Sequence, residues 1–169
     1  MRVQTYKVKK HTLEFKFLAG TSRGTLSNHH VKYLILQSND RFGVGEIAPL
    51  PKLSVDFDVD FECVLSTIDF ESCVFRSQED IFDWVSELKL YNYPSLVFAL
   101  EVALLDLLHG GSKKIFATDF YNLEERIPIN GLIWMNTKEH MLEQVQSKIE
   151  QGYSCIKMFL ILYSTGFSL

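Results

Sequence analysis

Alternating apolar and polar residues in the first fifty positions predict an antiparallel β-meander. Residues 13–17 alternate Leu, Phe and Phe with Glu and Lys, which is typical of a strand with one buried face. A second strand is expected at 31–37, and a polar turn at 38–40 leads into a third strand at 42–47. Glycines and hydroxylated residues at 19–25 predict a surface loop between the first two strands.

Helical spacing begins after the proline-rich stretch that follows the meander. Ser54 or Asp56 is a candidate N-cap for a short helix that runs to Ile68. Residues 77–90 open with an acidic variant of the capping box and place their apolar side chains on one stripe. The second of these segments therefore predicts an amphipathic helix.

The segment 94–109 is expected to form the central helix of the domain. Pro94 starts it, two glycines follow its end, and Ala99 and Ala103 lie one turn apart, which allows a neighbouring backbone to approach closely. Its apolar body is shorter than the ~20 residues of a membrane span and contains acidic residues. We therefore expect a buried helix of a soluble protein and no membrane partner. His109 is expected to cap this helix.

The pattern changes to strand, helix, strand after residue 125. Residues 127–134 are strand-like, a capping box at 136–139 opens a helix that ends at Gly152, and 155–162 form a second apolar strand-like run. Such a βαβ unit contains parallel strands, which need covering on both faces. A larger α/β domain is therefore expected to begin near Arg126 and to be cut off.

Composition and charge exclude several classes of function. The 169 residues are 47% hydrophobic, and 17 Lys+Arg against 21 Asp+Glu give a formal net charge of -4. This composition supports a packed core and shows no electrostatic footprint for nucleic acid, so no nucleic-acid partner is expected. Three cysteines without CxxC spacing argue against a disulfide framework or a zinc site and favour a reducing cytoplasm.

Four motifs of the sequence are distinctive. They are Gly20-Thr21-Ser22-Arg23-Gly24, Gly43-Val44-Gly45-Glu46-Ile47-Ala48-Pro49-Leu50-Pro51-Lys52-Leu53-Ser54, Ser95-Leu96-Val97-Phe98-Ala99-Leu100-Glu101 and Ile127-Pro128-Ile129-Asn130-Gly131-Leu132-Ile133-Trp134. Together they resemble the enolase superfamily, and within it the o-succinylbenzoate synthase branch of menaquinone biosynthesis. The resemblance implies an α+β capping domain at 1–125, followed at 126–169 by the first βαβ unit of a TIM-type α/β barrel. A complete barrel takes about 250 residues, so the implied barrel is incomplete.

The resemblance also implies a reaction and a metal. The family's synthases are carbon–oxygen lyases that eliminate water from a cyclohexadiene carboxylate, and their partner is therefore a small-molecule carboxylate. A base removes the proton next to the carboxylate while Mg²⁺ neutralises the developing charge. Lys157 matches the first lysine of the family's Lys-x-Lys motif, but Phe159 occupies the place of the proton-transferring lysine. The acidic metal ligands belong to later strands, so we expect no metal ligand in this chain.

The resemblance ends after Met158, which favours a frameshift or premature stop and predicts an inactive fragment. Sequencing the gene beyond its stop codon tests this expectation. One alternative is a dipeptide epimerase or N-acylamino-acid racemase, which shares the capping domain. The other is a non-catalytic capping fragment or binding module that self-associates through the apolar surface a barrel would cover.

Two loops are implied to cap the substrate. The first contains Thr21, Ser22, Arg23 and Gly24, with Arg23 near the substrate carboxylates, and the second contains Leu50, Leu53 and Ser54. Plain surface turns are the alternative for both loops.

Structural roles are favoured for three other polar residues. Glu46 is expected to make a hydrogen bond or ion pair, and His29 and His30 point to opposite faces of a strand rather than form a metal pair.

Overall fold

The computed structural model describes residues 1–21, 24–116, 118–122 and 125–158. The chain divides into two compact units. The first comprises Met1–Leu13 and His29–Glu125, and the second comprises Glu14–Asn28 and Arg126–Leu169. The tip of the first hairpin is therefore grouped with the C-terminal segment rather than with the helices of the first unit.

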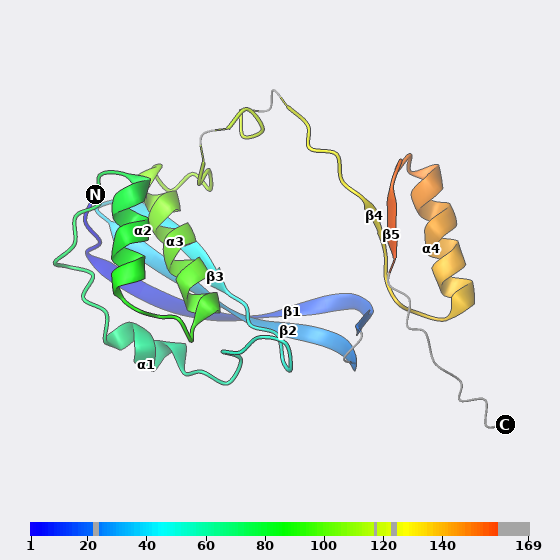
Figure 1. Ribbon diagram of the computed structural model, residues 1–169, viewed down its shortest axis with the longest axis horizontal. Coiled ribbons are helices and arrows are strands. Elements are labelled where there is room, and N and C mark those ends of the chain that lie inside the picture. The colour runs from blue at the N-terminus through cyan, green and yellow to red at the C-terminus, as the bar shows by residue number, and fades with distance from the viewer. Residues whose placement is uncertain (22–23, 117, 123–124, 159–169) are drawn as a thin grey trace. The chain divides into compact units, whose positions relative to one another are not determined.

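Three consecutive strands form the predicted meander. They are β1 (Thr5–Thr21), β2 (Gly24–Ser38) and β3 (Arg41–Ile47), in the order β1-β2-β3 (Figure 1). The antiparallel register of β2 and β3 runs from Lys32 opposite Ile47 to Ser38 opposite Arg41. Asn39 in the connecting turn has a positive φ of 55°, which Asn tolerates better than most residues.

The first two strands are longer than the sequence pattern indicates. β1 continues to Thr21 and β2 starts at Gly24, so most of the loop expected at 19–25 is strand. The physical reason is that neighbouring strands satisfy each other's backbone N–H and C=O groups whatever the side chains are. Small polar residues therefore do not end a strand that has a partner.

Three helices complete the first unit: α1 (Phe61–Ser66), α2 (Gln78–Glu87) and α3 (Pro94–Leu108). Figure 1 shows α2 and α3 side by side across one face of the sheet. The capping box predicted for α2 is present between Ser77 and Asp80. The cap predicted for α1 is wrong, because its N-cap is Asp60, whose carboxylate accepts hydrogen bonds from the first turn. His109 is the C-cap of α3, as predicted.

Helix α3 packs against β3 through two glycines. A Cβ atom built on Gly45 would lie 1.9 Å from the carbonyl oxygen of Ala99, and one built on Gly43 would lie 2.0 Å from that of Ala103. The close approach expected at the two alanines is therefore confirmed. The fully buried side chains around this contact form one core, which includes Leu34, Leu36, Ile47, Phe61, Leu65, Phe75, Ile81, Leu96, Leu100 and Leu104.

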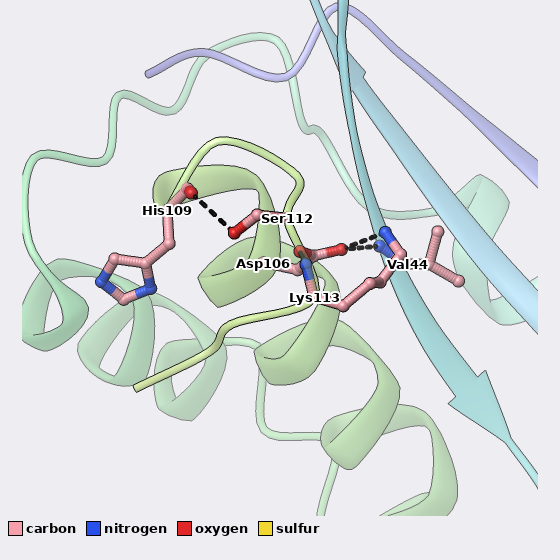
Figure 2. A network of polar contacts seen from close by, with 5 residues as sticks. All are labelled: Val44, Asp106, His109, Ser112 and Lys113. Atoms are coloured by element: carbon pink, nitrogen blue, oxygen red, sulfur yellow. Dashed lines mark hydrogen bonds and ion pairs between the residues drawn. The ribbon is translucent and has the colours of Figure 1, made fainter. Parts of the chain in front are cut away.

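A buried carboxylate joins the end of α3 to the sheet. Asp106 is 0% exposed and accepts hydrogen bonds from the backbone N–H groups of Val44, at 3.0 Å, and Lys113, at 2.7 Å (Figure 2). The ammonium of Lys113 also lies 2.6 Å from this carboxylate. All three donors converge on one side chain, so the position of α3 along β3 is set by polar contacts as well as by packing.

The second unit contains the predicted βαβ arrangement. Strands β4 (Gly131–Ile133) and β5 (Ile156–Met158) are parallel, with α4 (Lys138–Glu150) between them in sequence. Strand β4 is shorter than the expected 127–134, and β5 begins one residue later than expected. Residues 159–162 of the expected second strand lie outside the described residues. The N-cap of α4 is Thr137, one residue later than the capping box at 136–139 predicts. The fold class is thus confirmed, with an α+β unit of antiparallel meander and helices and a parallel βαβ unit.

Candidate functional site

The second predicted capping loop is a tight turn. The carbonyl oxygen of Leu50 accepts hydrogen bonds from the N–H groups of Leu53, at 3.2 Å, and Ser54, at 3.0 Å. The N–H of Leu50 in turn donates to the Ser54 hydroxyl at 2.9 Å. Lys52 at the apex has a φ of 61°. The structure therefore brings Leu50 and Ser54 together as the base of the turn and leaves the Leu53 side chain 56% exposed.

Asp56 connects this turn to α3, whereas the sequence pattern suggested that it caps the helix that follows it. Asp56 is 0% exposed, and its carboxylate accepts hydrogen bonds from the N–H of Ser95, at 2.7 Å, and from the Ser95 hydroxyl, at 3.0 Å. The N-cap residue of α3, Tyr93, supplies no side-chain hydrogen bond. Asp56 therefore caps α3 from outside that helix and anchors the loop that precedes α1.

Removing this carboxylate is expected to loosen the turn. Asp56→Ala leaves the half-buried Ser95 N–H without its acceptor, so we expect a loss of about 2 kcal/mol in the free energy of unfolding. Hydrogen–deuterium exchange of residues 50–56 should quicken in the same variant, since their anchor is gone. Chemical unfolding and exchange mass spectrometry measure the two effects.

Ser95→Ala is the matched control, because it deletes the hydroxyl contact and keeps the contact from the Ser95 N–H to Asp56. Its expected cost is about 1 kcal/mol. Exchange in residues 50–56 that is no faster in Asp56→Ala than in Ser95→Ala would show that the carboxylate does not anchor the turn.

Lys157 lies in the second unit, on β5. It is exposed, and its Cα is paired with that of Leu132 across the parallel sheet. β4 therefore positions its backbone. Phe159, the residue at the place of the family's second lysine, lies outside the described residues.

The first predicted capping loop is described only at its ends. Thr21 is the last residue of β1 and Gly24 is the first of β2, where it has a φ of 131°. Ser22 and Arg23 lie outside the described residues. Gly24 takes this backbone conformation readily because it has no Cβ.

Two further expectations concern titratable residues. Among the residues that the structure describes, the Glu46 carboxylate makes no hydrogen bond or ion pair, so the bonding role expected of it stays a prediction. In the described part, no group of three or more His, Cys, Asp or Glu side chains is arranged to hold a metal ion. Over the same residues, no helix is long and apolar enough to cross a membrane.

Comparison with known proteins identifies relatives of this fold. No protein-family model matches the chain. The curated o-succinylbenzoate synthase of Desulfotalea psychrophila is 35% identical over 177 residues, which cover 89% of this chain and 47% of that enzyme.

Solved structures lead to the same group of proteins. The crystal structure of MenC from Desulfotalea psychrophila matches with a TM-score of 0.70 and 28% identity, over 92% of this chain and 49% of that one. The L-Ala-D/L-Glu epimerase of Bacillus subtilis has a TM-score of 0.75 at 17% identity, over 95% of this chain and 45% of that one, and at this identity it shows the fold alone. The chain is thus similar over most of its length to o-succinylbenzoate synthases, and it spans about half the length of the relatives that it matches.

Proposed function

We propose that this chain is the capping and first barrel segment of an o-succinylbenzoate synthase. The observation that carries the proposal is the 35% identity to a curated synthase over 89% of the chain. Residues 1–125 serve as the capping domain, and residues 126–169 begin the barrel. The reaction is the elimination of water from a cyclohexadiene carboxylate in a reducing cytoplasm.

In this proposal the chain's own residues bind and enclose the substrate. The ammonium of Lys157 attracts the substrate carboxylate as a strongly localised positive charge. The two capping loops exclude water, which strengthens that attraction. The loop at 50–54 has the rigidity for this task, since its turn is internally hydrogen-bonded and anchored through Asp56. Leu53 presents exposed apolar surface at its apex.

The described residues do not fit the family's magnesium site. Magnesium needs several oxygen ligands, and the part of the chain that the structure describes offers no suitable cluster of carboxylates. Dipeptide epimerases of Methylococcus capsulatus and Cytophaga hutchinsonii have been solved with Mg and dipeptides. The roles proposed for this chain's residues therefore include neither metal binding nor proton transfer.

A chimera tests the proposed family function directly. Residues 1–158 replace the matching segment of the Desulfotalea psychrophila synthase, whose remaining barrel is kept. We expect the chimera to form o-succinylbenzoate in a spectrophotometric assay. Lys157→Gln in the chimera should lower kcat/KM roughly a hundredfold, since it removes the charge that holds the substrate carboxylate. Lys114→Gln, an exposed change in the capping segment, serves as the control for loss of one lysine.

Two results would contradict the proposal. A folded chimera that epimerises dipeptides and forms no o-succinylbenzoate would favour the epimerase alternative. A folded chimera whose synthase activity is unaffected by Lys157→Gln would remove the role given to that lysine. Circular dichroism establishes folding in both cases.

We further propose that the 169-residue chain alone is inactive and self-associates. Phe159 supports inactivity, since phenylalanine cannot transfer a proton. Exposed apolar side chains of the second unit support self-association, and they include Ile127 at 60% and Ile129 at 69% exposed. The purified chain is assayed with and without Mg²⁺ and run on size-exclusion chromatography. Turnover that a chelator abolishes would contradict the expected inactivity. A monodisperse monomer would contradict the expected self-association.

A further inference from the structure

The first unit contains a cavity of about 480 Å³ to which neither capping loop nor Lys157 contributes a lining residue. Its apolar lining comes from Val31, Ile47, Pro49, Phe57, Val59 and Phe61. Phe57 is 41% exposed, whereas Val31, Ile47 and Phe61 are almost fully buried behind the cavity surface. Its polar lining comes from β1 and β2. The volume lies in the range of small-molecule sites, which bury an apolar body and orient it with a few polar groups.

Two lysines line this cavity, and they differ in their partners. Lys10 is already paired, because its Nζ lies 2.8 Å from the Glu62 carboxylate. That hydrogen bond, and next the attraction between the two charges, raise the pKa of Lys10 above its ordinary value. Lys32 has its Nζ 5.3 Å from the centre of the Phe61 ring and makes no ion pair with any described residue. Lys32 therefore supplies a cation near an aromatic ring, and no carboxylate of the described residues pairs with it.

A histidine adds a hydrogen-bonding group to the same cavity. Nδ1 of His30 lies 2.9 Å from the hydroxyl oxygen of Thr12, and both residues line the cavity. When the threonine hydroxyl donates to Nδ1, the neutral ring carries its proton on Nε2. Nε2 is then a hydrogen-bond donor, and the contact between Thr12 and Nδ1 fixes the orientation of the ring.

We propose that this cavity binds a small aromatic carboxylate. Lys32 and His30 contact the carboxylate, and the apolar lining contacts the aromatic ring, chiefly through its more exposed members Phe57 and Val59. A charge-assisted hydrogen bond beside buried apolar surface is the recognition expected for an anion with a flat apolar body. The inference goes beyond the proposed function, because every lining residue belongs to the first unit and binding needs no catalytic step.

Cinnamate and cinnamyl alcohol are the probes, since they share a ring and chain but only the first carries a charge. Isothermal titration of the 169-residue chain should show saturable binding of cinnamate. The alcohol should bind at least roughly tenfold more weakly, which corresponds to about 1.4 kcal/mol. NMR shifts on adding cinnamate should centre on the residues that line the cavity. Equal binding of acid and alcohol, or no saturable binding of cinnamate, would overturn the proposal.

Lys32→Gln tests the cation itself. We expect the dissociation constant for cinnamate to rise roughly tenfold, whereas Lys9→Gln should leave it unchanged. Lys9 is a fair control because it is an exposed lysine of β1 that does not line the cavity. An unchanged dissociation constant for cinnamate in a folded Lys32→Gln variant would refute the role of that lysine. The comparison of acid with alcohol uses the unaltered chain, so it decides the matter even if the variant does not fold.

Discussion

Gly45→Ala is expected to cost about 3 kcal/mol or more in the free energy of unfolding, because overpacking a close backbone contact forces whole elements apart. The added Cβ would lie 1.9 Å from the carbonyl oxygen of Ala99 and 2.9 Å from its Cα. These are backbone atoms in the middle of α3, so no side-chain rotation relieves the overlap. Helix and strand must separate, and the fully buried core between them loosens.

Chemical unfolding followed by circular dichroism measures this loss. Gly110→Ala is the control, since Gly110 has a φ of 87° and its nearest outside atom is 4.0 Å away, at the end of the flexible Arg41 side chain. That substitution adds backbone strain of about 1 kcal/mol without overpacking. A Gly45→Ala protein no less stable than Gly110→Ala would show that α3 and β3 are not packed as closely as described.

Asp106→Ala is the second substitution with a large expected effect, at about 3 kcal/mol. It leaves two backbone N–H groups, those of Val44 and Lys113, without their acceptor, and it removes the partner of the Lys113 ammonium. Loss of the ion pair contributes least, because the Lys113 side chain is 60% exposed. The unsatisfied N–H of Val44, in the middle of β3, contributes more.

Asp83→Ala provides the comparison for this effect, since it removes an exposed carboxylate on α2 that makes no hydrogen bond or ion pair with any described residue. Its cost should stay within about 0.5 kcal/mol. Urea unfolding of the two variants in parallel gives the difference. Equal stability of the Asp106 and Asp83 variants would mean that the buried network does not hold α3 to the sheet.

Local patterns predicted the elements of this fold well. The meander, the capping box at Ser77 and the limits of α3 each depend on residues close in sequence, which is why they are readable without a structure. The ends of elements were predicted less well. The residues before Thr21 continue a strand because β2 pairs with β1, and that pairing depends on a partner rather than on local composition.

The candidate site was only partly predictable for the same reason. The resemblance to known motifs singled out Leu50, Leu53 and Ser54, but not what holds them. Asp56 was recognised as a capping residue and assigned to the wrong helix, because its true partner, Ser95, is remote in sequence. Nothing in the local pattern of Lys32 or His30 indicated that they line one cavity.

The sequence by itself determined the strand and helix segments, the alanine pair that lets a neighbouring backbone approach α3, and the family resemblance. Those properties follow from periodicity and residue size, which are local features of the sequence, and from motifs, which can be compared directly with those of known families. Only the tertiary structure decided that Asp56 caps α3, that Asp106 joins the helix to the sheet, and that Lys32 overlies Phe61. A buried carboxylate must accept hydrogen bonds, and the donors can come from any part of the folded chain. Its partners therefore depend on how the chain packs rather than on its neighbours in the sequence.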